Sequence, residues 1–148
     1  MSQICFDKIV IPLDGSENSL RALSYACYLA ENCNASLELL YVALMSKEIS
    51  AYAQITSSYI PDAVFSGAQE NGHKILQEGL KQVPSSLSVN CSLEIGCPPE
   101  KIIEFSEGVG TGLIVMGSRG LSALKGILVG SVSSYVMHHA KIPVMIVK

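Results

Sequence analysis

LIVMGSRGLSALKGILVGSVSS, residues 113–134, is the stretch of sequence from which the fold can be worked out. Its first four residues, Leu113 to Met116, are apolar and are typical of a strand buried on both faces of a sheet. Glycines and small polar residues follow at once, and Gly130 and Ser131 then lead into an apolar helical pattern. A buried strand, a glycine-rich loop and a helix in this order indicate one unit of a parallel α/β sheet.

The glycines of this stretch have the spacing Gly117-x2-Gly120-x9-Gly130, with a hydroxyl residue directly after the last glycine. Glycine lets the backbone approach a ligand closely and take up positive φ, so that several N–H groups can point into one concavity. The N-terminus of the following helix adds unpaired N–H groups and a partial positive charge. The spacing therefore indicates an anion site, and phosphate suits it best.

The side chains around the glycines are compatible with the same chemistry. Ser131 and Ser133 offer hydroxyl donors, and Arg119 or Lys125 offers positive charge. The alternative is that the glycines are ordinary loop residues and that Gly130 only starts a helix. The sequence contains neither a Walker loop nor a GxGxxG fingerprint here, so the glycines alone leave both interpretations open.

Apolar runs and helical patterns alternate along the rest of the chain. Pro12 should end the first strand, Ser16 should cap the first helix, and residues 32–34 should close it. The pattern is weak between Leu44 and Pro61, which we expect to be an irregular or partly mobile connection. The predicted strands are 8–14, 36–43, 88–95, 113–116 and 143–147, and the predicted helices are about 16–34, 61–83, 98–109 and 131–140. We predict one α/β domain over residues 1–148.

Composition narrows the function classes. The chain has 148 residues, a formal net charge of −3 and no basic run, which argues against nucleic-acid binding through bulk charge. No apolar run approaches the ~20 residues that cross a membrane, and the N-terminus does not look like a secretory signal, so we expect a cytoplasmic protein without membrane contact. The five cysteines form no CxxC and no zinc-finger spacing, and we expect buried free thiols.

Three segments resemble the universal stress protein family. They are KIVIPLDGSENSLRAL at 8–23, LIVMGSRGLSALKGILVGSVSSYVMHHA at 113–140 and IPVMIV at 142–147. The resemblance covers almost the whole chain and weakens between Leu44 and about Pro84. Its G-x2-G-x9-G-S/T element marks the branch of the family that binds ATP. Family members often have Asp where this chain has Gly112.

The resemblance implies a Rossmann-like open sheet of five parallel strands in the order 3-2-1-4-5, with helices on both faces. Its switch point lies between strands one and four, where open α/β sheets bind ligands beyond the carboxyl ends of the strands. The loops after Leu13 and Met116 should then face each other across one cleft. The implied ligand is ATP, or AMP or ADP, with Mg²⁺ reached through the phosphates.

The resemblance also assigns site residues. Asp14 is expected to accept from a ribose hydroxyl or to reach the Mg²⁺, and its alternative role is to cap the first turn. Val42 matches the position whose backbone reads the adenine edge. The other nucleoside positions are Pro12, Leu13, Met116 and Gly117, and the phosphate cradle is Ser118, Arg119, Gly120, Gly130, Ser131, Val132 and Ser133.

These assignments favour a regulatory nucleotide-binding module of the stress response, and we expect no catalytic residue set. In the family the last strand, Val144 to Val147, pairs with its copy, so a homodimer is expected. One alternative is a dimeric interaction protein that needs no nucleotide, and another is a slow ATPase. A related α-hydrolase enzyme would need SGGxDS after the first strand, where this chain has DGSE. His138 and His139 fit a helix C-terminus better than a catalytic role.

Overall fold

The computed structural model describes residues 6–45, 62–121, 125–126 and 128–148. The connection predicted to be irregular between Leu44 and Pro61 lies almost entirely outside these ranges. Five parallel strands form one sheet in the order β3-β2-β1-β4-β5, which confirms the predicted topology. The strands are β1 (Lys8–Pro12), β2 (Ser36–Leu44), β3 (Val89–Gly96), β4 (Leu113–Gly117) and β5 (Val144–Val147). The helices of the described ranges are α1 (Glu17–Cys33), α3 (Asp62–Leu80), α4 (Pro98–Gly108) and α5 (Ser131–His139).

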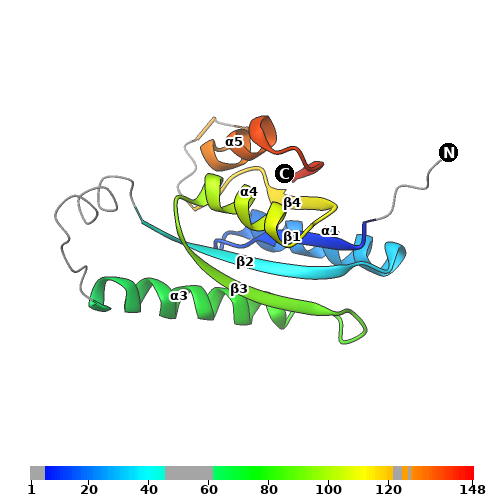
Figure 1. Ribbon diagram of the computed structural model, residues 1–148, viewed down its shortest axis with the longest axis horizontal. Coiled ribbons are helices and arrows are strands. Elements are labelled where there is room, and N and C mark those ends of the chain that lie inside the picture. Colours follow the sequence, from blue (N-terminus) through cyan, green and yellow to red (C-terminus); the bar gives the residue numbers. More distant parts are fainter. Residues whose placement is uncertain (1–5, 46–61, 122–124, 127) are drawn as a thin grey trace.

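The helices cover both faces of the sheet (Figure 1), with α3 on one side and α4 and α5 on the other. Alternate residues of β1 supply both cores, as the pleat of a strand requires. Ile9 and Ile11 are fully buried in the core beneath α1 and α3, and Val10 is fully buried in the core beneath α4 and α5. The continuous apolar pattern of the strand therefore reflects burial on both faces.

Helix α1 starts and stops where the sequence predicts. The Ser16 side chain accepts a hydrogen bond from the Ser19 amide at 3.2 Å, which satisfies one free donor of the first turn. At the other end Asn34 adopts the left-handed conformation, with φ 54° and ψ 37°, and its amide donates to the Ala30 carbonyl. Asparagine tolerates this conformation better than most residues, so it ends the helix.

Two glycines of α3 have opposite surroundings and give a stability prediction. A Cβ at Gly72 would lie 2.7 Å from Tyr41 Cε1 and 2.8 Å from Leu93 Cδ1, whereas a Cβ at Gly67 would meet nothing within 4 Å. Gly72→Ala is expected to lower the free energy of unfolding by about 1–3 kcal/mol, because the ring must move. Gly67→Ala should raise it by about 0.5–1 kcal/mol through helix propensity. Urea denaturation measures both, and equal effects would contradict this account of the helix packing.

The cysteine prediction is confirmed in one part and wrong in another. Cys5 lies outside the described residues, and the other four cysteines are free thiols. Of these, Cys27 is buried, Cys33 and Cys97 are partly buried, and Cys91 is exposed. Burial raises the pKa of the Cys27 thiol, and the charge of Glu31 raises it further. The residue Cys91 is exposed, but partial desolvation of its thiol still raises the pKa of that group, with the charge of Glu38 as the second cause. Both thiols are therefore protonated at neutral pH and are weak nucleophiles.

Candidate functional site

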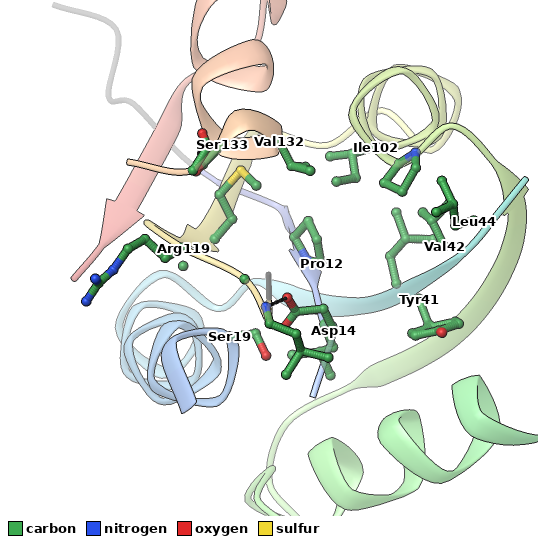
Figure 2. Close-up of a pocket in the computed structure, with 18 of the residues that line it drawn as sticks. Pro12, Asp14, Ser19, Tyr41, Val42, Leu44, Ile102, Arg119, Val132 and Ser133 are labelled. Carbon is green, nitrogen blue, oxygen red and sulfur yellow. Dashed lines mark hydrogen bonds between the residues drawn. The ribbon is translucent and has the colours of Figure 1, made fainter. Parts of the chain in front are cut away.

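A cavity of about 530 Å³ opens at the carboxyl ends of the strands, beside the β1–β4 switch point (Figure 2). This is the place where the topology of an open α/β sheet puts a ligand. The residues that line it are Pro12, Leu13, Asp14, Ser19, Leu40, Tyr41, Val42, Leu44, Asn71, Pro98, Ile102, Met116, Gly117, Arg119, Gly120, Leu121, Gly130, Ser131, Val132 and Ser133. All the residues to which the family resemblance assigns a role are in this set except Ser118, and Lys125, the alternative source of positive charge, is also not in it.

The cavity has an apolar end and a polar end. Figure 2 shows Val42, Leu44 and Ile102 on one side of Pro12, and Arg119 and Ser133 on the other. A flat apolar group suits the first end, because binding moves that group out of water and into contact with apolar side chains. The glycine-rich loop and the start of α5 make up the second end, where backbone N–H groups are available.

The last four residues of β2, 41–44, extend beyond the end of β1 and form a ledge of backbone at the apolar end of the cavity. The register of β1 on β2 ends at the Pro12–Leu40 pair, and β2 continues for four more residues to Leu44. The Leu40 carbonyl accepts from the Leu13 amide at 2.8 Å and so points toward β1. In a parallel strand, a residue's N–H and C=O point to the same neighbour, and this direction alternates along the chain. Both backbone groups of Val42 therefore point past the end of β1, toward the cavity.

Helix α5 presents an uncapped N-terminus to the polar end. Gly130 is its N-cap and makes no side-chain cap hydrogen bond, and the next three residues, Ser131 to Ser133, all line the cavity. The first turn of a helix leaves N–H groups without intrahelical partners and carries a partial positive charge. This end of the cavity is therefore built to attract an anion.

Close approach to neighbouring atoms accounts for Gly117 and Gly120, but neither close approach nor positive φ requires a glycine at position 130. Gly117, Gly120 and Gly130 are not among the positive-φ residues, so that part of the prediction is wrong. A Cβ at Gly117 would lie 2.9 Å from the carbonyl carbon of Asn18, so glycine there lets α1 pack against β4. A Cβ at Gly120 would lie 2.5 Å from Asp14 Oδ2, whereas at Gly130 the nearest atom is an ordinary 3.5 Å away.

Asp14 ties the two loops of the cleft together. Its Oδ1 accepts from the Ser16 amide at 2.9 Å, which is the local role considered for it as an alternative. Its Oδ2 accepts from the Leu121 amide at 3.2 Å, a bond that crosses the cleft and is dashed in Figure 2. Each carboxylate oxygen keeps lone-pair capacity after one such bond, so the group can still accept from a ligand or a cation.

Four residues that the sequence analysis considered either do not line the cavity or lie at its outer edge. They are Ser118, Arg119, His138 and His139. Ser118 is buried and is not among the residues that line the cavity, so its place in the phosphate cradle stays a prediction. Arg119 lines the cavity, but its guanidinium lies at the outer edge of the group of side chains, away from Pro12 (Figure 2). His138 and His139 lie in the last turn of α5, and neither lines the cavity.

Comparison with known proteins decides the family. The model of the Universal stress protein family matches residues 6–148. The chain belongs to this family. Universal stress protein MJ0531 of Methanocaldococcus jannaschii is 34% identical over 145 residues, which cover 97% of this chain and 82% of that protein. Universal stress protein YxiE of Bacillus subtilis is 30% identical, with 97% and 99% covered.

Solved universal stress protein structures share the fold. A universal stress protein crystallised in complex with cAMP is 25% identical, with a TM-score of 0.72 and 97% and 98% of the two chains covered. The protein MJ0577 is 26% identical, with a TM-score of 0.75 and 98% and 97% covered. The overall fold and the sequence thus agree for a universal stress protein.

The universal stress protein motifs do not reach every residue of the cavity. Tyr41 and Asn71 line it from β2 and α3, and Asn71 Nδ2 donates to Tyr41 Oη at 3.4 Å. Tyr41 directly precedes the predicted site residue Val42 in β2, and this neighbourhood could have indicated that Tyr41 also lines the cavity. No feature of the sequence indicated that Asn71 lines the cavity, because its side chain reaches the cavity only through the packing of α3 on β2. The other unpredicted lining residues are Ser19, Leu40, Leu44, Pro98, Ile102 and Leu121.

The described residues contain no group of three or more His, Cys, Asp or Glu side chains that could hold a metal ion. In those same ranges, no helix is long and apolar enough to cross a membrane. A cation that accompanies a phosphate could take ligands from both the phosphate and the chain. Asp14 is the carboxylate that lines the cavity and could take part.

Proposed function

We propose that this chain is a regulatory module of the stress response that binds an adenine nucleotide in the cleft between the loops after β1 and β4. The observation that carries the proposal is the uncapped N-terminus of α5 facing the same cavity as the open ledge of β2. One end suits phosphate and the other suits a flat base. The complex of a related universal stress protein with cAMP supports the same class of ligand.

The ledge favours adenine among the bases. The Val42 C=O and N–H point past the end of β1 and offer one acceptor and one donor side by side. Adenine presents an amino donor next to a ring-nitrogen acceptor, which complements this pair, whereas guanine presents a carbonyl and a ring N–H in the reverse order. Ile102 and Pro98 add apolar surface near the base.

Purified protein tests the proposal directly. Denaturing it and identifying any released nucleotide by chromatography and mass should yield an adenine nucleotide near one per chain. Protein stripped of ligand should bind ATP in a calorimetric titration and bind GTP at least about tenfold more weakly, the effect of about 1.4 kcal/mol from mismatched hydrogen bonds. Protein that is empty and binds neither nucleotide would contradict the proposal and favour assembly without a ligand.

The role of Asp14 toward Mg²⁺ is tested in the same titration. Asp14→Ala should weaken ATP binding, because the carboxylate lines the cavity and retains acceptor capacity. A loss seen in Mg²⁺ but not in chelator assigns Asp14 to a phosphate-bound metal. An equal loss in both conditions assigns it to the ribose. Unchanged affinity in both would leave Asp14 with its structural bonds only.

We also propose that the module is a homodimer that pairs through β5. The strand is the last of the sheet and joins β4 on one side, so its other edge has no strand partner in the described chain. Val144, Met145 and Ile146 are only partly buried, and pairing with a second copy would cover them. Light scattering at micromolar concentration should give twice the chain mass, and a Met145→Lys variant should be monomeric. A monomeric parent protein would contradict this assembly.

A further inference from the structure

The two glycine segments of the site meet at one buried atom, the carbonyl oxygen of Ser118. The Gly130 amide donates to this oxygen at 2.6 Å, and the Ser133 hydroxyl donates to it at 2.7 Å. Ser118 and Ser133 are each 2% exposed, so water does not compete for these bonds. A carbonyl oxygen has two lone pairs and can accept both donors at once. The residue after β4 therefore holds the N-cap and the first turn of α5 together.

The Ser133 hydroxyl has only one proton to give. The hydroxyl oxygen lies 2.7 Å from the Ser118 carbonyl oxygen and 3.3 Å from the Gly130 carbonyl oxygen, and both of these partners are acceptors. Ionised phosphate oxygens are acceptors too, so a phosphate gains no hydrogen bond from this hydroxyl while the contact stands. The Ser131 hydroxyl and the α5 amides are different, because Ser131 is exposed and the N-cap supplies no side-chain cap.

The contact also closes a loop. The chain leaves the sheet after Ser118 and α5 begins after Gly130, and the 2.6 Å bond joins these two points, which together form the stem of the site. The donors of the α5 N-terminus and those of the Gly117–Gly120 segment share one cavity only if this stem holds. Ordering the stem before a ligand arrives lowers the entropy cost of binding.

We propose that Ser133 is a positioning residue. Its hydroxyl fixes the Ser118 carbonyl and so keeps the α5 N-terminus and the glycine loop in one cradle for a nucleotide phosphate, without bonding to the phosphate itself. The proposal rests on the proposed nucleotide site and adds to it the way in which the phosphate end is held ready. The family resemblance assigns Ser133 to the phosphate cradle as a ligand contact, whereas in this proposal its hydroxyl holds the cradle together.

Ser133→Ala tests this assignment against Ser134→Ala, the same change one position along α5 at an exposed site. Hydrogen exchange of the Gly130 amide is measured on the ligand-free proteins. Losing one hydrogen bond from the stem should speed this exchange by about three- to tenfold in Ser133→Ala. Affinity for ATP should fall by a similar factor of about three to ten, and affinity for adenosine should stay within about twofold. Ser134→Ala should match the parent protein in all three measurements.

The outcomes separate the two proposals. If the parent protein binds no ATP, the proposed function fails, and the phosphate cradle fails with it. If the parent binds ATP and Ser133→Ala behaves like it, only the positioning role fails. Weaker ATP binding with unchanged Gly130 exchange would make Ser133 a direct phosphate contact and overturn the proposal. Equal losses for ATP and adenosine would show a general disturbance of the cavity and would also overturn it.

Discussion

Gly130→Leu is expected to weaken ATP binding by about a hundredfold while the fold survives. Gly130 lines the polar end of the cavity and is the N-cap of α5, so a side chain there competes with a phosphate for the same N–H groups. Losing two charge-assisted hydrogen bonds, at about 1.5 kcal/mol each, corresponds to that factor. Calorimetric titration with ATP measures the loss.

The folded chain itself tolerates a larger residue at Gly130. Its φ of −73° and ψ of 168° are open to any residue, and a Cβ would make contacts of 3.5 Å or more. We expect the free energy of unfolding to fall by about 1 kcal/mol, the cost of a poor N-cap residue. Gly108→Leu is the matched control, because a Cβ there meets nothing within 4 Å and Gly108 is not a lining residue. Unchanged ATP affinity in Gly130→Leu would contradict the proposal that a phosphate binds at this end of the cavity.

The second large effect concerns stability. Lys8→Met is expected to lower the free energy of unfolding by about 3 kcal/mol, because it leaves the carboxylate of Glu38 buried without a counter-charge. Glu38 is 5% exposed, its Oε1 lies 3.7 Å from Lys8 Nζ, and Asn90 Nδ2 donates to the same oxygen at 3.0 Å. The variant also loses the 3.0 Å bond from Lys8 Nζ to the Val109 carbonyl. Urea denaturation followed by circular dichroism measures the change.

Two further variants isolate the charge effect. Lys81→Met breaks an ion pair of 2.9 Å with Glu78, but both side chains are largely exposed, and the expected loss is about 0–1 kcal/mol. Adding Glu38→Met to Lys8→Met should recover much of the stability, because no charge is then left buried. A double variant as unstable as Lys8→Met alone would assign the loss to the Val109 bond and to packing.

Local signals in the sequence were sufficient where a few neighbouring residues decide the structure. Ser16 and Asn34 end α1 through bonds within their own turns, and Pro12 ends β1 because it lacks a donor. The strand order came from the family resemblance, since spacing alone does not say which strands pair. The family resemblance also pointed to Gly117, Gly120 and Gly130, which line the cavity, and their contact with a nucleotide stays a prediction.

Prediction failed where the result depends on packing between distant elements. Asn71 reaches the cavity because Gly72 lets α3 lie close to Tyr41, and no periodicity encodes that contact. The sequence also did not indicate that Ser118 is buried or that its carbonyl accepts bonds from Gly130 and Ser133. Cys91 follows an alternating pattern but remains exposed on β3, the edge strand of the sheet.

The difference in length between β1 and β2 has a consequence for how this protein can diverge. Four residues of β2 extend past the last β1 partner, and the groups that Val42 turns toward the cavity belong to its main chain. Main-chain groups do not change when a side chain is substituted. Base preference at this ledge would therefore be inherited with the strand ends and not with any particular amino acid. Replacement of Val42 by another strand-forming residue should be neutral for the choice of base, leaving evolution free to alter the cavity walls and rim.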